Sequence, residues 1–194
     1  MPVYVDSPLT VKITDVFRMH PDEYDAETRR LVFSGDSPFD FPELTYVESV
    51  EDSKRIDAET RPSIIISASG MAEFGRVVHH LRAIIGGPEH TVLIIGYQAE
   101  HTLGRRLVEQ RRKVRIFGVM QERLCEVGVL DGFSAHADRD GLIGFAEQVR
   151  DRGSLRGVAL VHGEVQAQNS LRDALIERRF TTVHVPARGQ RVRF

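Results

Sequence analysis

Short apolar runs that alternate with helical patterns constrain the fold of this chain more than any other feature. Runs at residues 62–69 (PSIIISAS), 91–97 (TVLIIGY) and 157–162 (GVALVH) are rich in β-branched residues, and each leads through a polar loop into a stretch with helical spacing. Such runs, bounded by Gly or Pro, are typical of strands buried on both faces. Their alternation with helices predicts an α/β fold with a mainly parallel sheet flanked by helices.

The same pattern extends to the rest of the chain. Strands are also predicted over residues 2–5, 114–118 and 182–185, with 191–194 as a further candidate. Helical patterns follow at residues 7–20, 76–85, 102–112, 140–151 and 170–179. Two segments break the alternation: 34–61 is predicted as a loop with a short helix over 48–56, and 119–130 as one or two strands without a crossover helix. We place a domain boundary between residues 119 and 120.

Composition narrows the class of protein. Hydrophobic residues make up 41% and charged residues 28% of the chain, as in soluble globular proteins. There is no apolar run near the roughly 20 residues of a membrane span, and no signal-peptide pattern at the start. A single cysteine, Cys125, excludes an intrachain disulfide and predicts a cytoplasmic protein. Because the net charge is −2, any nucleic-acid contact must come from local patches.

Four loops follow predicted strands, where open parallel sheets bind ligands. They span residues 67–75, 96–104, 132–140 and 162–169. The first is rich in Ser and Gly and opens a helix, so its backbone amides suit an anion such as phosphate. Alternatively, Ser67 and Ser69 only cap that helix.

The second loop carries Thr102 as a predicted helix cap and Arg105 in the first helical turn. Arg105 either pairs with a phosphate or points into solvent. His101, His79 and His80 are interpreted as surface or packing residues and not as metal ligands. For His79 and His80 the reason is that adjacent residues on a helix point in different directions and cannot share a metal.

His136 and His162 each follow a strand pattern within a short loop of small or acidic residues. Imidazole is a common zinc ligand, but zinc needs three or four ligands and the chain has no HxH, HxxxH or Cys pair. Glu164 could accept a proton from His162 or bind the metal itself. Asp138 could support the site, or only cap the following helix. Spacing alone leaves a metal site and two structural histidines as open alternatives.

Taken together, the segments SASGM, GYQAEHTLGR, GFSAHAD and VHGE resemble the β-CASP branch of the metallo-β-lactamase superfamily. The opening PVYVDSPLTVKITDVFRMHPDEYD and the segment SGDSPFDFPEL resemble it too, so the resemblance covers nearly the whole chain. It is closest to bacterial RNA-processing exonucleases. The resemblance implies a two-domain zinc hydrolase that cuts RNA, in which residues 1–119 form part of the β-CASP domain and residues 120–194 form the C-terminal part of the metallo-β-lactamase αββα fold.

The resemblance also assigns site residues. His136 matches the catalytic position that contacts the scissile phosphate, and His162 matches the family's late zinc ligand. Around these two histidines, the residue types themselves make Asp138 and Glu164 the candidates to support the site through hydrogen bonds. The expected RNA phosphate contacts are Ser69, Gly70, Arg105 and Ser134.

Several family features are absent. The HxHxDH motif, the later zinc-binding His and Asp, and the acidic motif that opens the β-CASP insert do not occur, and His101 stands where relatives usually have Gly. We therefore expect the C-terminal portion of a zinc-dependent ribonuclease, inactive as this chain alone. Zinc is expected in the full-length family enzyme and not retained here. RNA is the expected partner. A second copy of the chain, in a homodimer, or the missing N-terminal half is a possible second partner. No contact with a membrane or with DNA is expected.

Two other functions stay open at this stage. The chain could be a non-catalytic β-CASP-like protein that binds RNA or a protein partner. It could also be an unrelated α/β enzyme acting on a phosphate-bearing small molecule, although SASGM is not GxGxxG and no P-loop pattern occurs.

Overall fold

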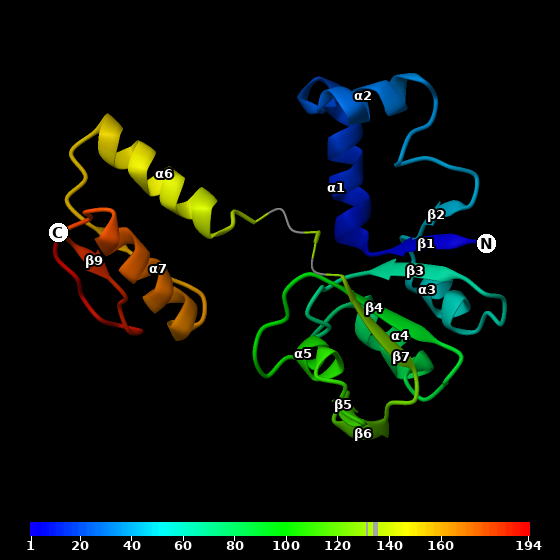
Figure 1. Cartoon of the computed structure of the whole chain (residues 1–194). Coiled ribbons are helices and arrows are strands. Elements are labelled where there is room, and N and C mark those ends of the chain that lie inside the picture. The colour runs from blue at the N-terminus through cyan, green and yellow to red at the C-terminus, as the bar shows by residue number, and fades with distance from the viewer. Residues whose placement is uncertain (131, 134–135) are drawn as a thin grey trace. The chain divides into compact units, whose positions relative to one another are not determined.

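The computed structural model describes residues 1–130, 132–133 and 136–194. The chain divides into two compact units, residues 1–134 and residues 135–194, whose elements are labelled in Figure 1. Among the described residues, no helix has the length and apolar composition of a membrane span.

The first unit begins with a parallel sheet in the order β2-β1-β3. Its strands are β1 Val3–Asp6, β2 Leu44–Tyr46 and β3 Ile64–Ser67. Parallel neighbours need crossover connections, and here these carry α1 Pro8–Met19, the 3₁₀ turn Pro21–Glu23, α2 Ala26–Phe33 and α3 Val50–Asp57. Helix α1 begins there because Ser7 caps it, accepting from the Thr10 amide at 3.3 Å, and Pro8 suits its first position.

The rest of the first unit is built around a second parallel pair and a hairpin. Strand β4 Thr91–Ile95 pairs with β7 Glu126–Leu130, and β5 Lys113–Ile116 pairs antiparallel with β6 Val119–Glu122. Helices α4 Arg76–Ile84 and α5 Leu103–Val108 pack against these strands. The shared core contains Leu81, Ile85, Leu107, Val114, Ile116 and Cys125.

The second unit is a small α/β layer. Its elements are α6 Arg139–Arg152, β8 Val158–Ala159, α7 Val165–Glu177 and β9 Val183–His184. The two short strands pair in parallel, and Ile143, Ala174, Leu175 and Phe180 form the core beneath them.

The predicted α/β class with parallel sheets is confirmed. The prediction that the strands are buried on both faces is wrong for β3 and β4. Ile64 and Ile66 on β3 are 45% and 50% exposed, and Leu93 and Ile95 on β4 are 52% and 55% exposed. On β4 the intervening Val92 and Ile94 are buried in the core with α4 and α5, so this strand is covered on one face.

Several elements differ from the prediction. Residues 191–194 form no strand, and Phe194 instead packs its ring edge-on against His184. Helix α7 starts at Val165, five residues before the predicted start. Helix α2 and strand β2 were not predicted, because both are short and β2 lies in a polar segment broken by Pro.

Candidate functional site

The loops after β3 and β4 are joined into one surface. The Gln98 side-chain Nε2 donates to the Gly70 carbonyl at 3.0 Å, and the Gly104 amide donates to the Met71 carbonyl at 3.0 Å. The Leu103 amide also donates to the Glu73 carboxylate. The two loops, predicted separately from sequence, therefore act as a pair. Between them lies an open hollow of about 330 Å³, lined by Ser69, Gly70, Met71, Glu73, Phe74, Ile95, Tyr97 and Gln98.

Gln98 is the residue that joins the loops, and it was not predicted from the sequence. It is buried, and its Nε2 also donates to the carbonyls of Gly96 and Tyr97 at 3.3 and 3.1 Å. A Cβ on Gly104 would lie 1.7 Å from Gln98 Oε1, so a glycine is needed where helix α5 passes this amide. The sequence signal that could have identified it is a glutamine placed between Tyr97 and the helix that Thr102 caps.

Ser69 and Gly70 lie at the hollow, and the helix-capping alternative for the serines is wrong. Ser69 Oγ donates to the Phe74 carbonyl at 3.2 Å, which closes the loop on itself, and Ser67 Oγ donates to the Asp6 carbonyl at 2.8 Å. The residue that precedes α4 is Gly75, with φ +88°, and no side chain caps this helix.

Arg105 lies in the first turn of α5, which Thr102 caps as predicted. Thr102 Oγ1 accepts from the Arg105 amide at 3.1 Å. The Arg105 guanidinium donates to Glu109 at 2.9 Å, and Arg111 pairs with the same carboxylate at 2.8 Å. Hydrogen bonds from Arg105 and Arg111 lower the pKa of the Glu109 carboxyl.

A buried polar network fixes the first loop from below. Asp6, at the end of β1, is fully buried and accepts hydrogen bonds from Ser53 at 2.5 Å, from His80 Nε2 at 2.7 Å and from Arg76. The other His80 nitrogen, Nδ1, lies 2.5 Å from Asp57 Oδ1. The network joins β1, α3 and the first turns of α4. It also confirms that His80 is a packing residue.

The charge state of Asp6 follows from these contacts. Burial alone raises the pKa of its carboxyl, but the hydrogen bonds from Ser53, Arg76 and His80, with the Arg76 charge, lower it below the ordinary value of 3.8. Asp6 is therefore an anion at neutral pH that holds Arg76 at the start of α4.

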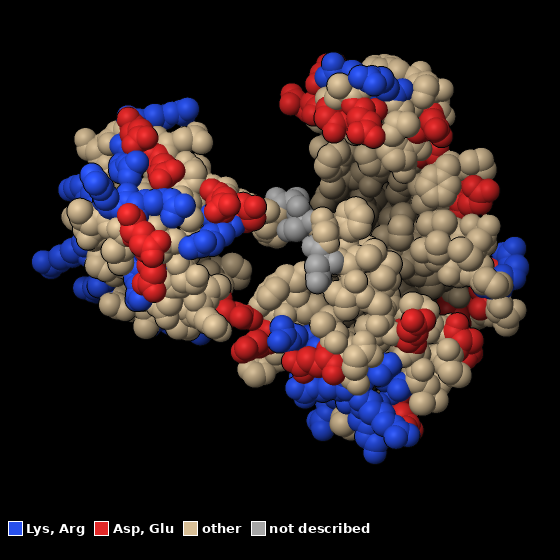
Figure 2. All heavy atoms as spheres, viewed as in Figure 1, with Lys and Arg blue, Asp and Glu red and all other residues tan. Residues whose placement is uncertain are grey.

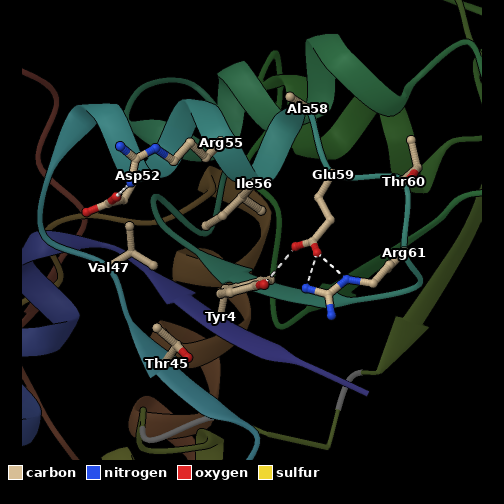
Figure 3. A pocket seen from close by; sticks show the side chains of 10 residues that line it. All are labelled: Tyr4, Thr45, Val47, Asp52, Arg55, Ile56, Ala58, Glu59, Thr60 and Arg61. Atoms are coloured by element: carbon tan, nitrogen blue, oxygen red, sulfur yellow. Dashed lines mark hydrogen bonds and ion pairs between the residues drawn. The ribbon is translucent and has the colours of Figure 1, made fainter.

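A larger hollow, about 660 Å³, lies beside helix α3 and strands β1 and β2 (Figure 3). Its charged groups pair with one another. The Tyr4 hydroxyl donates to Glu59 at 2.7 Å and Arg61 Nε donates to the other carboxylate oxygen at 2.5 Å, as the dashed lines in Figure 3 show. Hydrogen bonds from Tyr4 and Arg61 lower the pKa of Glu59. The pairing holds the segment that leads into β3.

In the second unit, His136 lies exposed before α6, and the capping alternative for Asp138 is observed. Asp138 Oδ1 accepts from the Gly141 amide at 2.8 Å at the start of this helix. His162 is exposed between β8 and α7 with φ +68°, and Glu164 occupies the N-cap position of α7 without making the capping bond. The predicted phosphate contact Ser134 lies outside the described residues.

The structure thus places Ser69, Gly70 and Arg105 in the first unit and the two histidines in the second. The roles assigned to all of these residues stay predictions. Among the described residues, no three His, Cys, Asp or Glu side chains converge as a metal site would require. Zinc needs three or four such ligands, so these residues do not by themselves fit a zinc ion, and no chemical step through zinc is derived from them.

Two family models match the chain. The Beta-Casp domain matches residues 1–107, and the Zn-dependent metallo-hydrolase RNA specificity domain matches residues 121–186. The chain belongs to the β-CASP branch of the metallo-β-lactamase superfamily. The compact units divide later, after residue 134, because β7 pairs with β4; the domain boundary at 119/120 stays a prediction.

Curated relatives carry names from RNA metabolism and transcription. Ribonuclease TTHA0252 of Thermus thermophilus is 31% identical over 163 residues, covering 84% of this chain and 36% of the relative. Transcription termination factor FttA of Methanosarcina mazei is 31% identical over 173 residues, covering 86% and 27%. FttA of Cenarchaeum symbiosum is 31% identical over 193 residues, covering 95% and 29%. The chain therefore spans about a third of the length of these relatives.

Proposed function

We propose that this chain is the RNA-contacting C-terminal portion of a zinc-dependent ribonuclease of RNA processing or decay. The observation that carries the proposal is the joined pair of loops with its open hollow, in a chain of the β-CASP family. Ribonuclease TTHA0252 supports the reaction class.

The hollow has the features of a single-stranded RNA site. Phe74 and Tyr97 line it and are 73% and 61% exposed, and stacking of bases on exposed aromatic rings is the usual way in which proteins hold a single strand. Ser69, Gly70 and Arg105 would contact phosphates beside them. A Cβ on Gly70 would meet no heavy atom within 4 Å, so a strand can approach this backbone closely.

The catalytic part of the proposal rests on the second unit. His136 would contact the scissile phosphate, and His162 would supply one ligand to a zinc centre whose other ligands come from outside this chain. The exposure of both histidines supports this, because neither ring is used in the core. Asp138 and Glu164 would hold the two loops in place from the starts of α6 and α7.

The test compares the chain alone with a hybrid enzyme, in which this chain replaces the matching portion of ribonuclease TTHA0252. We expect the chain alone to bind no stoichiometric zinc and to leave RNA intact. The hybrid should cleave RNA, and His162→Ala should remove both zinc and cleavage. Zinc binding with RNA cleavage by the chain alone, lost in His162→Ala, would contradict the proposed inactivity.

The second candidate function is a non-catalytic protein that binds RNA or a partner. The absence of a converging ligand set among the described residues favours it. The exposed apolar side chains of Ile64, Ile66, Leu93 and Ile95 also suit this function, because a protein partner or a second copy would cover them. A hybrid that binds RNA without cleaving it would favour this function, and light scattering of the chain would show self-association.

A further inference from the structure

Basic residues gather at one end of the first unit. Residues 105–123 contain seven Lys or Arg against two Glu, a net charge of +5, in a chain whose net charge is −2. Figure 2 shows these blue side chains gathered over the region of α5 and the β5–β6 hairpin. We call this the basic hairpin surface and define it by Arg111, Arg112, Lys113, Arg115 and Arg123.

Two cations on this surface face outward without partners. Strand β5 alternates, with Val114 and Ile116 each 1% exposed and Lys113 and Arg115 exposed on the opposite face. Within the part of the chain that the structure describes, neither the Lys113 side chain nor the Arg115 side chain makes a hydrogen bond or ion pair. Glu122, which lies across from Lys113, pairs instead with Arg112 at 2.8 Å.

The surface is preformed. The Arg123 guanidinium donates to the Arg111 carbonyl and to the Gln110 carbonyl, both at 3.3 Å, and to the Cys125 carbonyl. These bonds fix the turn that enters β5 against the strand that leaves the hairpin. The backbone that carries these cations is therefore fixed, and it loses less conformational entropy on binding than a loop that must first be ordered.

The surface is also continuous with the candidate RNA site. Glu109 bridges Arg105, beside the second loop, and Arg111, at the start of the hairpin, at 2.9 and 2.8 Å. The run of basic residues therefore extends from Arg105, beside the second loop, into the hairpin. Since the rest of the first unit is net negative, this surface is where phosphates gain most within that unit.

We propose that the basic hairpin surface binds the backbone phosphates of a single RNA strand that extends from the two loops, with Lys113 and Arg115 as the main contacts. The inference rests on the proposed function for the identity of the polyanion. Contacts of this kind position a strand without reading its sequence.

The test measures binding of a fluorescent oligouridylate to the full chain by anisotropy at several salt concentrations. The double variant Lys113→Gln with Arg115→Gln is compared with Lys12→Gln with Lys54→Gln, which removes the same charge from exposed sites on α1 and α3. Each phosphate contact on a single strand contributes about 0.7 to the slope of log K against log salt. We expect the hairpin variant to lose about 1.4 in slope and to bind about 25-fold more weakly at ~0.1 M salt. Exchange of the two cations, Lys113→Arg with Arg115→Lys, should restore binding.

Three outcomes would overturn the inference. The first is an equal loss of RNA affinity in the hairpin and control variants, and the second is an absence of salt-sensitive RNA binding by the wild-type chain. The third is binding of oligoglutamate that is tighter than binding of RNA, which would indicate an acidic protein partner. The proposed function is judged separately, by RNA cleavage in the hybrid. If the hybrid cleaves RNA but the hairpin variant binds RNA like the wild type, only the inference about the basic hairpin surface would fail.

Discussion

Replacing Asp6 with Asn removes the one charge on which the buried network of the first unit depends. The amide has nearly the same volume, so no cavity forms. It leaves the Arg76 guanidinium, whose side chain is 15% exposed, without its counter-charge. It also replaces one carboxylate oxygen, which faces donors from Ser53, Arg76 and His80, with an NH₂ group.

Removing one partner of a buried ion pair destabilises a protein by about 3–5 kcal/mol. Adding three charged hydrogen bonds at about 1.5–3 kcal/mol each would overstate the loss. Arg76 keeps its bonds to the carbonyls of Val47 and Glu48, at 3.1 and 2.6 Å, and His80 keeps Asp57. We therefore expect Asp6→Asn to lower the free energy of unfolding by about 3–5 kcal/mol.

The assay is urea unfolding followed by far-ultraviolet circular dichroism. The control is Asp15→Asn, which breaks an exposed pair with Arg18 at 2.9 Å, and a pair of this kind contributes under about 1 kcal/mol. If Asp6→Asn were no more destabilising than the control, the reasoning from burial and partners would be refuted.

The same substitution carries a pH signature. Because the pKa of Asp6 is lowered in the folded chain, its contribution is fully present above the ordinary value of 3.8 and is lost as the pH falls through the lower folded pKa. The difference in stability between wild type and Asp6→Asn should shrink below about pH 4. Other carboxylates titrate alike in both proteins, so they cancel in this difference. A difference that stays constant into strong acid would contradict the assignment.

Three further predictions concern single positions. Gly104→Ala should destabilise the first unit by about 1–3 kcal/mol despite the better helix propensity of Ala, because the new Cβ would meet Gln98. The control Gly70→Ala places its Cβ in open space and should change stability by less than about 0.5 kcal/mol. Equal urea midpoints for the two variants would contradict this. His101 has φ +70°, so His101→Gly should raise the melting temperature, gaining up to about 1 kcal/mol after the entropy of Gly is deducted; a lower melting temperature would count against it. Cys125 is fully buried and burial raises the pKa of its thiol, so Ellman's reagent should react with it only in urea; rapid labelling of the native chain would show that this core is open.

The fold could be predicted where local sequence signals determine the element. Helix α1 has a Ser cap and a Pro at its first position, and strand β4 is a β-branched run between turns. Strand β2 has only three residues, and what makes it a strand is its pairing with β1, some 40 positions away. Pairing at that distance leaves no trace in the local pattern. Full burial of β3 and β4 was overpredicted because a β-branched run does not show whether a second layer covers it.

The sequence predicted which loops form the candidate site, but it did not predict the contacts that join them. The loops themselves follow strands, and the caps at Thr102 and Asp138 could be inferred from residue type and place. Gln98 and His80 could not, because their partners lie 28 and 74 positions away. A polar residue at the end of an apolar strand, such as Asp6, is the signal that such a network exists, but it does not name the partners.

The structure separates what holds the candidate RNA surface from what would touch RNA. The Asp6 network fixes α4 from its buried side, and Gln98 joins the two loops through backbone carbonyls. These contacts use side chains that the solvent does not reach. Phe74, Tyr97 and the outward cations of β5 are exposed at the surface. Substitutions at Lys113 and Arg115 should therefore weaken RNA binding without changing stability, whereas Asp6→Asn should act on binding only through the fraction of folded protein.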